Sequence, residues 1–352
     1  MALRAPRVHD GWVTSRPFRL AFLGLFLASC DPGVAVDDAA IDDAALDDAG
    51  PAGLITHDVR IIVEPSDNAA MLVAAIDGAT ASVHMTMYLL TSSNVIDALI
   101  RAHARHVDVR VVLNQSFPSG GGPSNSSSFT QLASAGIPVH WASSRFSLTH
   151  EKCLVIDARE AWIMTMNATT TSPSSNREYL AVDHEPVDVR DADAIFEADF
   201  AGNLFPSYAG PLIVAPLNAQ SRLFDLITHA QHSIDVEDEE LSDTNIVNAL
   251  VGAAGRGVTV RVVIASGSLT SAQQAAVTNL MSAHIPVRSL SSPNVHAKAI
   301  VVDNALAYVG SINLTAASIL HNRELGIITD NAAAVTTVAT TIASDFAAGR
   351  SF

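Results

Sequence analysis

The sequence is poor in positive charge, in aromatic residues and in cysteine, and each shortage excludes a class of protein. Its 352 residues carry 20 Lys and Arg against 36 Asp and Glu, which gives a formal net charge of -16. Such a chain has no surplus of cations to displace counterions from phosphates, so unspecific nucleic-acid binding is disfavoured. Aromatic residues make up 5% of the chain, too few for a base-stacking surface. The two cysteines cannot build a disulfide framework and lack zinc-ligand spacing.

The longest apolar run, LAFLGLFLAS at residues 20–29, is too short to cross a bilayer as a stable helix. Four arginines precede it and Cys30 follows it, an order that is typical of a signal peptide. The ending LASC resembles the bacterial lipobox, in which the cysteine is lipidated and becomes the mature N-terminus. We therefore expect residues 1–29 to be removed and Cys30 to anchor an exported lipoprotein of the cell envelope. Release of the protein as a secreted form is the alternative. A short buried helix with an incidental cysteine is the structural alternative.

Residues 30–54 are predicted to be an acidic, flexible tether. They contain aspartate pairs at 37/38, 42/43 and 47/48 but neither helical periodicity nor enough apolar surface to fold. A calcium site in these aspartates is the alternative, although no glycine-turned loop with a closing glutamate is present. Removal of residues 1–29 takes away four arginines and one aspartate, so the mature chain would carry a charge of about -19.

An internal repeat occupies the remainder of the sequence. Residues 94–112 align without gaps on residues 245–263, and each block has apolar residues at helical spacing followed by the alternation of a strand. Matching strand patterns lie before and after these blocks. We predict an α/β fold made of two βαβα repeats, residues 55–208 and 209–352, each a mixed sheet flanked by helices. The two would pack as a pseudo-twofold pair around one active site.

Residues capable of chemistry recur in the two copies at the same offsets of 0, +2, +7, +17 and +28. Each copy begins with His-x-Lys at the start of an apolar strand, whose two-residue period puts the imidazole and the ammonium on one face. A cation at this position is costly to bury unless an anion binds to it. The pattern therefore favours a catalytic site that binds an anion over a set of hydrogen-bonded polar residues in a core. The first copy has His150, Lys152, Asp157, Asn167 and Glu178, and the second has His296, Lys298, Asp303, Asn313 and Glu324.

These residues resemble the signature of the phospholipase D superfamily, which is H-x-K-x4-D, an Asn in a G-S-x-N-like turn and then a Glu. The second copy matches the turn with Gly310 and Ser311, whereas the first has Met164 and Thr165 there. The resemblance implies phosphodiester hydrolysis without a metal or a cofactor. One histidine attacks phosphorus to give a phosphohistidine, and the other protonates the departing alcohol. Two-copy relatives suggest that the histidine of the first copy is the nucleophile.

The same resemblance implies roles for the other members. Glu178 and Glu324 would accept a hydrogen bond from the far nitrogen of the histidine in their own copy and so fix its tautomer and angle. The two aspartates lie at strand ends, where holding a loop or balancing charge is at least as plausible as direct catalysis. The residues expected to bind phosphoryl oxygens are Lys152, Asn167, Lys298, Ser311 and Asn313.

Four further features are weaker candidates for a role in the site. Tyr88 in the first copy corresponds to Glu239 in the second, and such a position either lines the cleft or packs at its rim. The run EDEELSD, residues 237–243, is predicted to be a solvated strand end. Cys153 is expected to point away from the site by strand alternation. The segment 117–129, which the second copy lacks, is either a surface loop or a lid.

The sequence therefore predicts a phospholipase D-type phosphodiesterase that cleaves the head group of a phospholipid and leaves phosphatidate. The expected partners are a phospholipid substrate and, through the anchor, a membrane; the protein would be a monomer containing an intrachain pseudo-dimer. A nuclease on the same site is less attractive because the chain is acidic. A phosphatidyltransferase and a catalytically dead binding lipoprotein are two further candidates, although all ten residues of the two half-sites are intact.

Overall fold

The computed structural model describes residues 54–115, 117, 124–203, 205 and 207–352. The predicted signal peptide, Cys30, the tether up to residue 53 and residues 118–123 of the loop lie outside these residues. The described part lies within one structural unit, Ala49–Phe352. None of its helices is both long and apolar enough to span a membrane.

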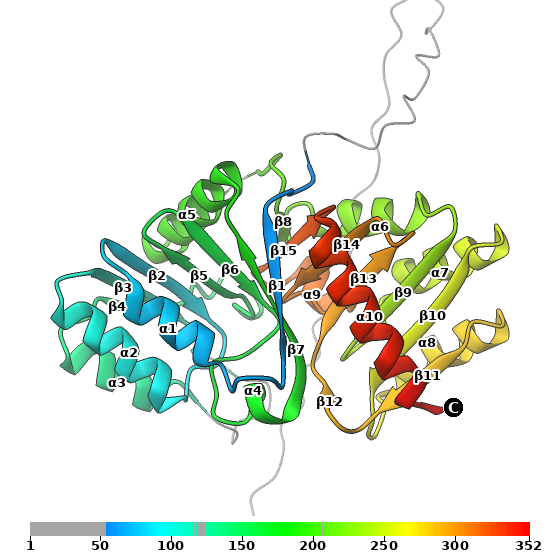
Figure 1. Ribbon diagram of the computed structural model, residues 1–352, viewed down its shortest axis with the longest axis horizontal. Coiled ribbons are helices and arrows are strands. Elements are labelled where there is room, and N and C mark those ends of the chain that lie inside the picture. The colour runs from blue at the N-terminus through cyan, green and yellow to red at the C-terminus, as the bar shows by residue number, and fades with distance from the viewer. Residues whose placement is uncertain (1–53, 116, 118–123, 204, 206) are drawn as a thin grey trace, which may run out of the picture. The chain divides into compact units, whose positions relative to one another are not determined.

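The first repeat forms a mixed sheet (Figure 1). Neighbours in it pair antiparallel except around β3, which is parallel to both its neighbours, and a short strand from the second repeat, β12 (Asn294–Val295), is parallel to β7. The strand order is β1 (Val59–Glu64), β7 (Asn176–Asp183), β6 (Glu160–Met164), β5 (Lys152–Ile156), β2 (Ser82–Met87), β3 (Asp108–Leu113) and β4 (Val139–Trp141).

The second repeat forms a sheet of the same design. Three neighbouring strands, each preceded by a helix, run parallel to one another, and the strands that follow the His-x-Lys motif are antiparallel. The strand order is β16 (Arg350–Ser351), β11 (Val287–Leu290), β10 (Thr259–Ala265), β9 (Ser233–Asp238), β13 (Lys298–Val302), β14 (Leu306–Gly310), β15 (Glu324–Thr329) and β8 (Ile213–Ala215).

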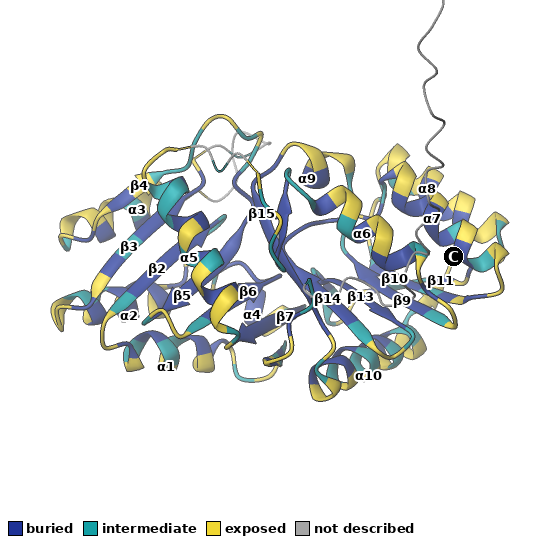
Figure 2. Cartoon of the chain, turned by 90° about the horizontal axis from the view of Figure 1, so that it is seen from above, coloured by how far each residue is buried: buried dark blue, intermediate teal, exposed yellow. Residues whose placement is uncertain are grey.

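Helices flank both sheets, and Figure 2 shows their exposed outer faces around buried strands. The first repeat has α1 (Ala70–Gly78), α2 (Ser93–Ala104), α3 (Ser126–Ser134), α4 (Ser172–Ser175) and α5 (Pro186–Phe200). The second has α6 (Ala219–Thr228), α7 (Thr244–Gly255), α8 (Ser271–Ser282), α9 (Ala316–Leu320) and α10 (Ala332–Ala348).

The predicted fold class and repeat are confirmed. The aligned blocks 94–112 and 245–263 fold as the equivalent pairs α2–β3 and α7–β10. Beyond the predicted βαβα unit, each copy continues into three antiparallel strands, β5–β7 or β13–β15. These extra strands are the ones that carry the His-x-Lys motif and the glutamate.

The two repeats share a core between their sheets. Strands β5, β6 and β7 contribute Val155, Ile163 and Tyr179 to it, and β13 and β14 contribute Val301 and Val309, all of them buried. Each sheet has a second core on its other face, under its own helices. Because one continuous apolar layer joins the sheets, the strands on either side of it hold a fixed relation to one another.

Gly310, the last residue of β14, is required by the packing of its own sheet. A Cβ at this position would lie 2.5 Å from the Cα of Gly326, its partner on β15. In the first repeat the equivalent Met164 is fully buried in the core beneath the sheet. The difference between the two turns is therefore a matter of strand packing, and it leaves both His-x-Lys motifs in place.

Candidate active site

The beginnings of two strands bring the histidines of both repeats to one cleft and place the two buried lysines directly behind its wall. Lys152 opens β5 and Lys298 opens β13, each two residues after its histidine. Both strands are runs of apolar, largely β-branched residues that suit a buried place in a sheet. The cleft has a volume of about 650 Å³. Its lining includes Tyr88, Phe117, His150, Asn167, Glu239, Glu240, His296 and Asn313.

Each histidine is paired with the glutamate of the other repeat. Nδ1 of His150 lies 2.8 Å from Oε2 of Glu324, and Nδ1 of His296 lies 2.9 Å from Glu178. The expectation that each histidine is oriented within its own copy is therefore wrong. The crossing follows from the packing of the two sheets, which turns the starts of β5 and β13 toward β15 and β7 of the opposite repeat. When the proton of a neutral ring is on Nδ1, the ring nitrogen that faces the cleft is the unprotonated Nε2.

Both glutamates are held in place by neutral donors. The hydroxyl of Thr165 donates to Glu178 at 2.6 Å, and the amide of Asn322 donates to Glu324 at 3.0 Å. Ser311, which occupies the place of Thr165 in the second copy, instead exchanges hydrogen bonds with the backbone of Leu325. Since Ser311 is also fully buried, the expectation that it binds phosphate must be corrected.

The two lysines have different surroundings. Nζ of Lys152 donates to the carbonyl of His150 at 2.5 Å and stands 4.8 Å from the centre of the Tyr88 ring. Nζ of Lys298 donates to the carbonyl of its own histidine at 2.7 Å and to Glu239 at 2.8 Å. Burial lowers the pKa of Lys152 to about 7. Burial acts on Lys298 in the same sense, but nearby carboxylates, Glu239 first, outweigh it and raise the pKa of that ammonium.

Burial likewise makes His150 a weak base. It lowers the pKa of the ring to about 4, although Glu324 acts in the opposite direction. The pKa of Glu324 is lowered: burial alone would raise it, but His150 and Lys152 prevail. At neutral pH the first half-site therefore contains an uncharged imidazole hydrogen-bonded to a carboxylate, the state a nitrogen nucleophile needs.

Asn167 and Asn313 face the cleft from equivalent turns. Within the described part of the chain, the Oδ1 atom of each is buried without a hydrogen-bond partner. Nδ2 of Asn313 is 3.4 Å from Glu240. Side-chain amides with spare hydrogen-bonding capacity beside two histidines and two lysines can bind the oxygens of an anionic ligand.

Asp157 and Asp303 lie at the other ends of β5 and β13 and do not line the cleft. The carboxylate of Asp157 accepts the backbone N–H groups of Thr80, Ala81 and Ser82 at 2.7–3.1 Å. Asp303 does the same for residues 231–233 of the second copy. Of the two roles that the sequence left open, the structure supports the holding of a loop. The expectation of a catalytic role is corrected, because these carboxylates do not reach the cleft.

Sequence reasoning missed the importance of one acidic run. The prediction that residues 237–243 are a solvated strand end is wrong, because Glu237 and Asp238 are fully buried. Glu237 accepts the hydroxyl of Tyr179 at 2.6 Å, and Asp243 caps the N-terminus of α7. Glu239 faces the cleft. The alignment of the repeats, which pairs Glu239 with Tyr88, predicts a place in the cleft or at its rim, and the structure confirms the first of these.

Two other ambiguous features are resolved in part. Cys153 is buried in the core between the sheets, and burial raises the pKa of its thiol well above its usual value. Of the segment 117–129, Phe117 packs on Tyr88 with ring centres 5.0 Å apart, and residues from Ser126 onward belong to α3. Phe117 therefore forms part of the cleft wall.

Among the described residues, one group has the spacing of a metal site: His84, Asp193 and Glu197. Arg110 already occupies this group. Its guanidinium donates to Glu197 at 2.8 Å and lies 2.6 Å from Nε2 of His84. The guanidinium cation thus already contacts two of the three members, and the group lies away from the cleft.

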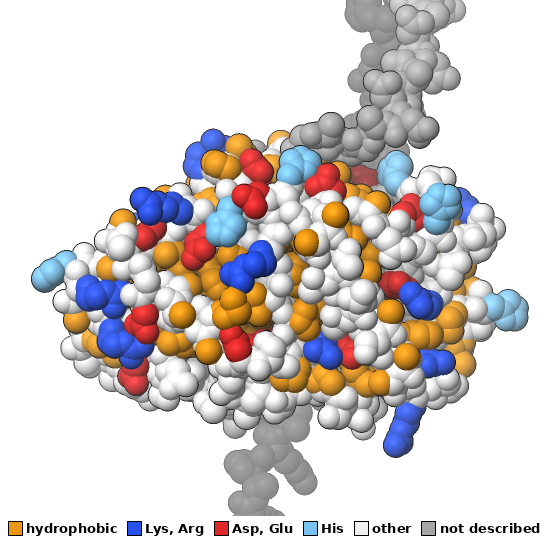
Figure 3. Space-filling model, in the orientation of Figure 1, with side chains coloured by type: hydrophobic (Ala, Val, Ile, Leu, Met, Phe, Trp, Pro, Cys, Tyr) orange, Lys and Arg blue, Asp and Glu red, His pale blue; other side chains and the backbone are white. Residues whose placement is uncertain are grey.

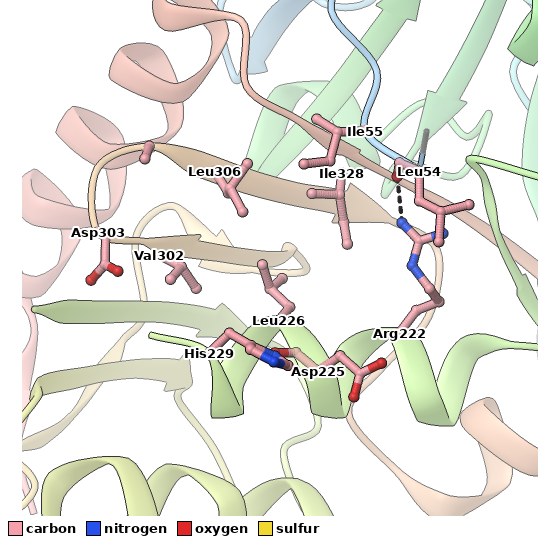
Figure 4. Close-up of a pocket in the computed structure, with 11 residues that line it drawn as sticks. Leu54, Ile55, Arg222, Asp225, Leu226, His229, Val302, Asp303, Leu306 and Ile328 are labelled. Atoms are coloured by element: carbon pink, nitrogen blue, oxygen red, sulfur yellow. Dashed lines mark hydrogen bonds between the residues drawn. The ribbon is translucent and has the colours of Figure 1, made fainter. Parts of the chain in front are cut away.

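A second cavity, of about 210 Å³, lies at the distal end of the second sheet (Figure 4). Leu226, Leu306 and Ile328 point into it, and Arg222 at its edge donates to the carbonyl of Leu54. It contains none of the histidines or lysines of the repeated motif. The chemistry of the molecule is therefore concentrated in the larger cleft.

Two mixed sheets that bring paired His-x-Lys strands to a single cleft define the phospholipase D class of protein. The chain belongs to this superfamily: it matches the family described as "Cardiolipin synthase, PLD-like domain" over residues 72–200 and 223–347. The match covers one segment in each repeat, and each segment contains the His-x-Lys motif, so both half-sites belong to the family's domain.

Individual relatives cover parts of the chain. It is 34% identical to phospholipase D Z of Dictyostelium discoideum over 142 residues, 33% of each chain. It is 35% identical to a mitochondrial cardiolipin hydrolase of Xenopus tropicalis over 115 residues, 32% of this chain and 54% of that protein. The fold is shared with phosphatidylserine synthase of Haemophilus influenzae Rd KW20, with a TM-score of 0.64 and 10% identity over 85% and 88% of the two chains. The chain thus spans about a third to a half of these curated relatives.

Proposed function

We propose that this protein is a metal-independent phosphodiesterase of the phospholipase D type, which hydrolyses the head group of a phospholipid to leave phosphatidate. The observation that carries the proposal is the pair of histidine–carboxylate dyads facing one cleft, each beside a buried lysine. Such a site supplies a nucleophile, a proton donor and positive charge for the phosphoryl oxygens from the chain itself.

The reaction has two steps. Nε2 of His150 attacks phosphorus while the bond to the head-group oxygen breaks, and His296 gives its proton to the departing alkoxide. His296, now neutral, takes a proton from a water molecule that attacks phosphorus and breaks the P–N bond. Phosphatidate leaves, His150 is restored as a neutral ring and His296 as an imidazolium. Lys152, Lys298 and the cleft asparagines stabilise charge on the non-bridging oxygens in both transition states.

A nuclease built on the same site is the second candidate. The acidic composition disfavours it, since a polyanionic strand would meet net repulsion. On the face drawn in Figure 3, the described basic side chains are interspersed with acidic ones, without a continuous basic band. A phosphatidyltransferase would follow the same first step, with an alcohol in place of water in the second.

The deciding experiment incubates the purified full chain with mixed phospholipid vesicles and, separately, with plasmid DNA, each with and without EDTA. We expect phosphatidate to be released equally with and without chelator. Nicked plasmid without phosphatidate would select the nuclease, and phosphatidyl-alcohol formed on addition of a short alcohol would measure the transferase branch. Loss of all activity in EDTA would reject the mechanism.

We also propose that Cys30 carries a lipid that holds the protein at a membrane of the cell envelope. The support is the order of basic flank, apolar run and LASC in the sequence. Cys30→Ala should move the protein from the membrane fraction to the soluble fraction. A variant that stays with the membrane would reject the anchor without touching the proposed reaction.

A further inference from the structure

The two half-sites differ at one position that has the same backbone setting in both repeats. The backbone N–H of Tyr88 donates to the carbonyl of Glu151 at 2.9 Å, and that of Glu239 donates to the carbonyl of Ala297 at 3.1 Å. Glu151 and Ala297 are the middle residues of the two His-x-Lys motifs. Tyr88 and Glu239 are therefore structural equivalents, an aromatic ring in one half-site and a carboxylate in the other.

We propose that Glu239 is a positioning residue that holds a proton on His296 and so fixes His150 as the nucleophile. The inference rests on the proposed function and deepens it. It concerns a question that the symmetric motifs leave open, namely which of two similar histidines attacks and which donates.

In the second half-site both ring nitrogens of His296 face carboxylates. Nδ1 lies 2.9 Å from Glu178, and Nε2 lies 3.4 Å from Oε2 of Glu239. A neutral imidazole carries one N–H and can satisfy only one of these acceptors, whereas the imidazolium carries two. The geometry thus stabilises the protonated ring, with a proton on the nitrogen that faces the cleft, as a general acid requires.

The first half-site lacks this second carboxylate. Nδ1 of His150 is paired with Glu324, but the described residues form no ion pair with its Nε2. The ring meets the Tyr88 ring edge-on, with centres 4.4 Å apart. A neutral ring has one N–H group, which is enough for the single acceptor Glu324. The lone pair then lies on Nε2, the nitrogen that faces the cleft.

The lysines follow the same division. The charge of Lys298 is matched by Glu239 at 2.8 Å, whereas Lys152 stands over the Tyr88 ring and forms no ion pair among the described residues. A phosphodiester anion therefore finds its uncompensated cation beside His150. This places phosphorus next to the neutral ring and the leaving oxygen toward His296.

Several charged groups surround His296. Glu178 comes from β7, Glu239 and Glu240 follow β9, Lys298 lies on β13, and the first half-site faces them across the cleft. Of the two glutamates after β9, the ion pair with the ring is made by Glu239. Glu239→Gln removes that charge at nearly constant shape. Glu240→Gln, one residue further on, is the matched control for loss of a negative charge from the same segment.

The first measurement needs no turnover. Ring ¹⁵N shifts and N–H couplings of labelled full-length protein are recorded at neutral pH, and the signals of His150 and His296 are assigned by their loss in His150→Asn and His296→Asn. We expect an N–H group on both ring nitrogens of His296 but on only one of His150, and we expect Glu239→Gln to remove the second N–H group of His296. Glu240→Gln should retain both N–H groups. A single N–H group on each ring, or a second N–H group on His296 that Glu239→Gln leaves in place, would overturn the proposal.

The second measurement is kinetic. A protonated His296 is needed to expel an alkyl head group, whereas nitrophenolate departs with little help. Glu239→Gln should therefore lower kcat on an alkyl ester by about tenfold or more relative to kcat on a nitrophenyl ester, and Glu240→Gln should change this ratio by less than half as much. Equal losses on the two esters in Glu239→Gln would overturn the catalytic half of the proposal. A parent protein that cleaves no phosphodiester, yet shows two N–H groups on His296, would reject the proposed function and leave the proton assignment standing.

Discussion

Nδ1 of His150 lies 2.8 Å from Oε2 of Glu324, across the boundary between the repeats. The reciprocal contact joins His296 to Glu178, so each dyad is completed by residues more than a hundred positions apart in the chain. Neither repeat alone contains an oriented histidine. The duplicated motif is therefore one active site divided between two sheets, and its geometry depends on the core that packs them together.

The crossed pairing predicts which carboxylate serves which step. Glu324→Gln should slow formation of the phosphohistidine by about 100-fold or more, because the carboxylate that orients and stabilises the nucleophilic ring is lost. Glu178→Gln should leave that step nearly intact for a nitrophenyl ester and slow the cleavage of an alkyl ester. The burst of nitrophenolate in stopped flow separates the two cases. If Glu178→Gln slows phosphohistidine formation and Glu324→Gln slows only the cleavage of an alkyl ester, each glutamate serves the histidine of its own copy.

A pH dependence follows from the groups of the first half-site. On a nitrophenyl ester, which needs little help from the acid His296, the free enzyme is active when His150 is neutral and Lys152 is charged. The pKa of His150 is lowered to about 4 and that of Lys152 to about 7, so kcat/KM should rise as pH increases through 4 and fall above 7. Bound phosphate favours the charged ammonium, so the alkaline fall should be weaker in kcat. In Lys152→Arg the side chain stays charged above pH 7, so the fall of kcat/KM should move to higher pH. If the fall stays at the same pH in this variant, it belongs to another group.

Asp157 provides a test of structural against catalytic roles. Its backbone lies in the left-handed region (φ 52°), which Asn tolerates at least as well, so Asp157→Asn changes mainly the charge and the number of acceptors. We expect the free energy of unfolding to fall by about 1–3 kcal/mol, because backbone N–H groups lose their charged acceptor. Urea denaturation measures this loss, and kcat should stay within about twofold of the parent. A large fall in kcat without loss of stability would restore the catalytic reading.

The acid dependence of that contribution has a definite sign. The backbone N–H groups hold the pKa of Asp157 below its usual value, although burial opposes them. A carboxyl group whose pKa is lower in the folded state stabilises the fold above its unfolded pKa, and this stability is lost as pH falls through the folded value. The difference in unfolding free energy between the parent and Asp157→Asn should therefore shrink on acidification below about pH 4.

The parts of the structure that the sequence predicted are those set by local periodicity and by the repeat. Alternation gives the strand that begins at Lys152, helical spacing gives α2 and α7, and equal offsets identify the histidines as one constellation. The crossing of Glu178 and Glu324 was not predictable, because self-alignment associates residues of the same copy. Pairing between copies is decided by how the two sheets pack.

The acidic run after β9 shows a second limit. Composition predicts that Glu237 and Asp238 are solvated, yet both are buried. Each bonds to a group from a distant segment: Glu237 accepts the Tyr179 hydroxyl, and Asp238 accepts the backbone N–H of Leu314 at 3.3 Å. Burial raises the pKa of each of these two carboxyl groups to about 8. Propensity scales cannot register such partners, since they come from the other repeat or from tertiary turns.

The roles of the two histidines can be separated by the leaving group of the substrate. An alkoxide is a poor leaving group and needs a proton from His296, whereas nitrophenolate departs with little help. His296→Ala should therefore lose about 100-fold or more on a phospholipid but retain partial activity on a nitrophenyl phosphodiester. Because the same residue activates water in the second step, this variant should also accumulate acid-labile phosphate on His150.

His150→Ala is the matched variant. Without the nucleophile no covalent intermediate forms on any substrate, so it should be inactive on both esters and trap no phosphate. Circular dichroism and urea denaturation of both variants check that each is folded. The roles would be reversed by two results together. The His150→Ala variant would trap phosphate on His296, and the His296→Ala variant would be inactive and carry no phosphate. Of the two histidines, His296 is the one with which Glu239 forms an ion pair among the described residues. The reversal would therefore also contradict the division of charge between the half-sites.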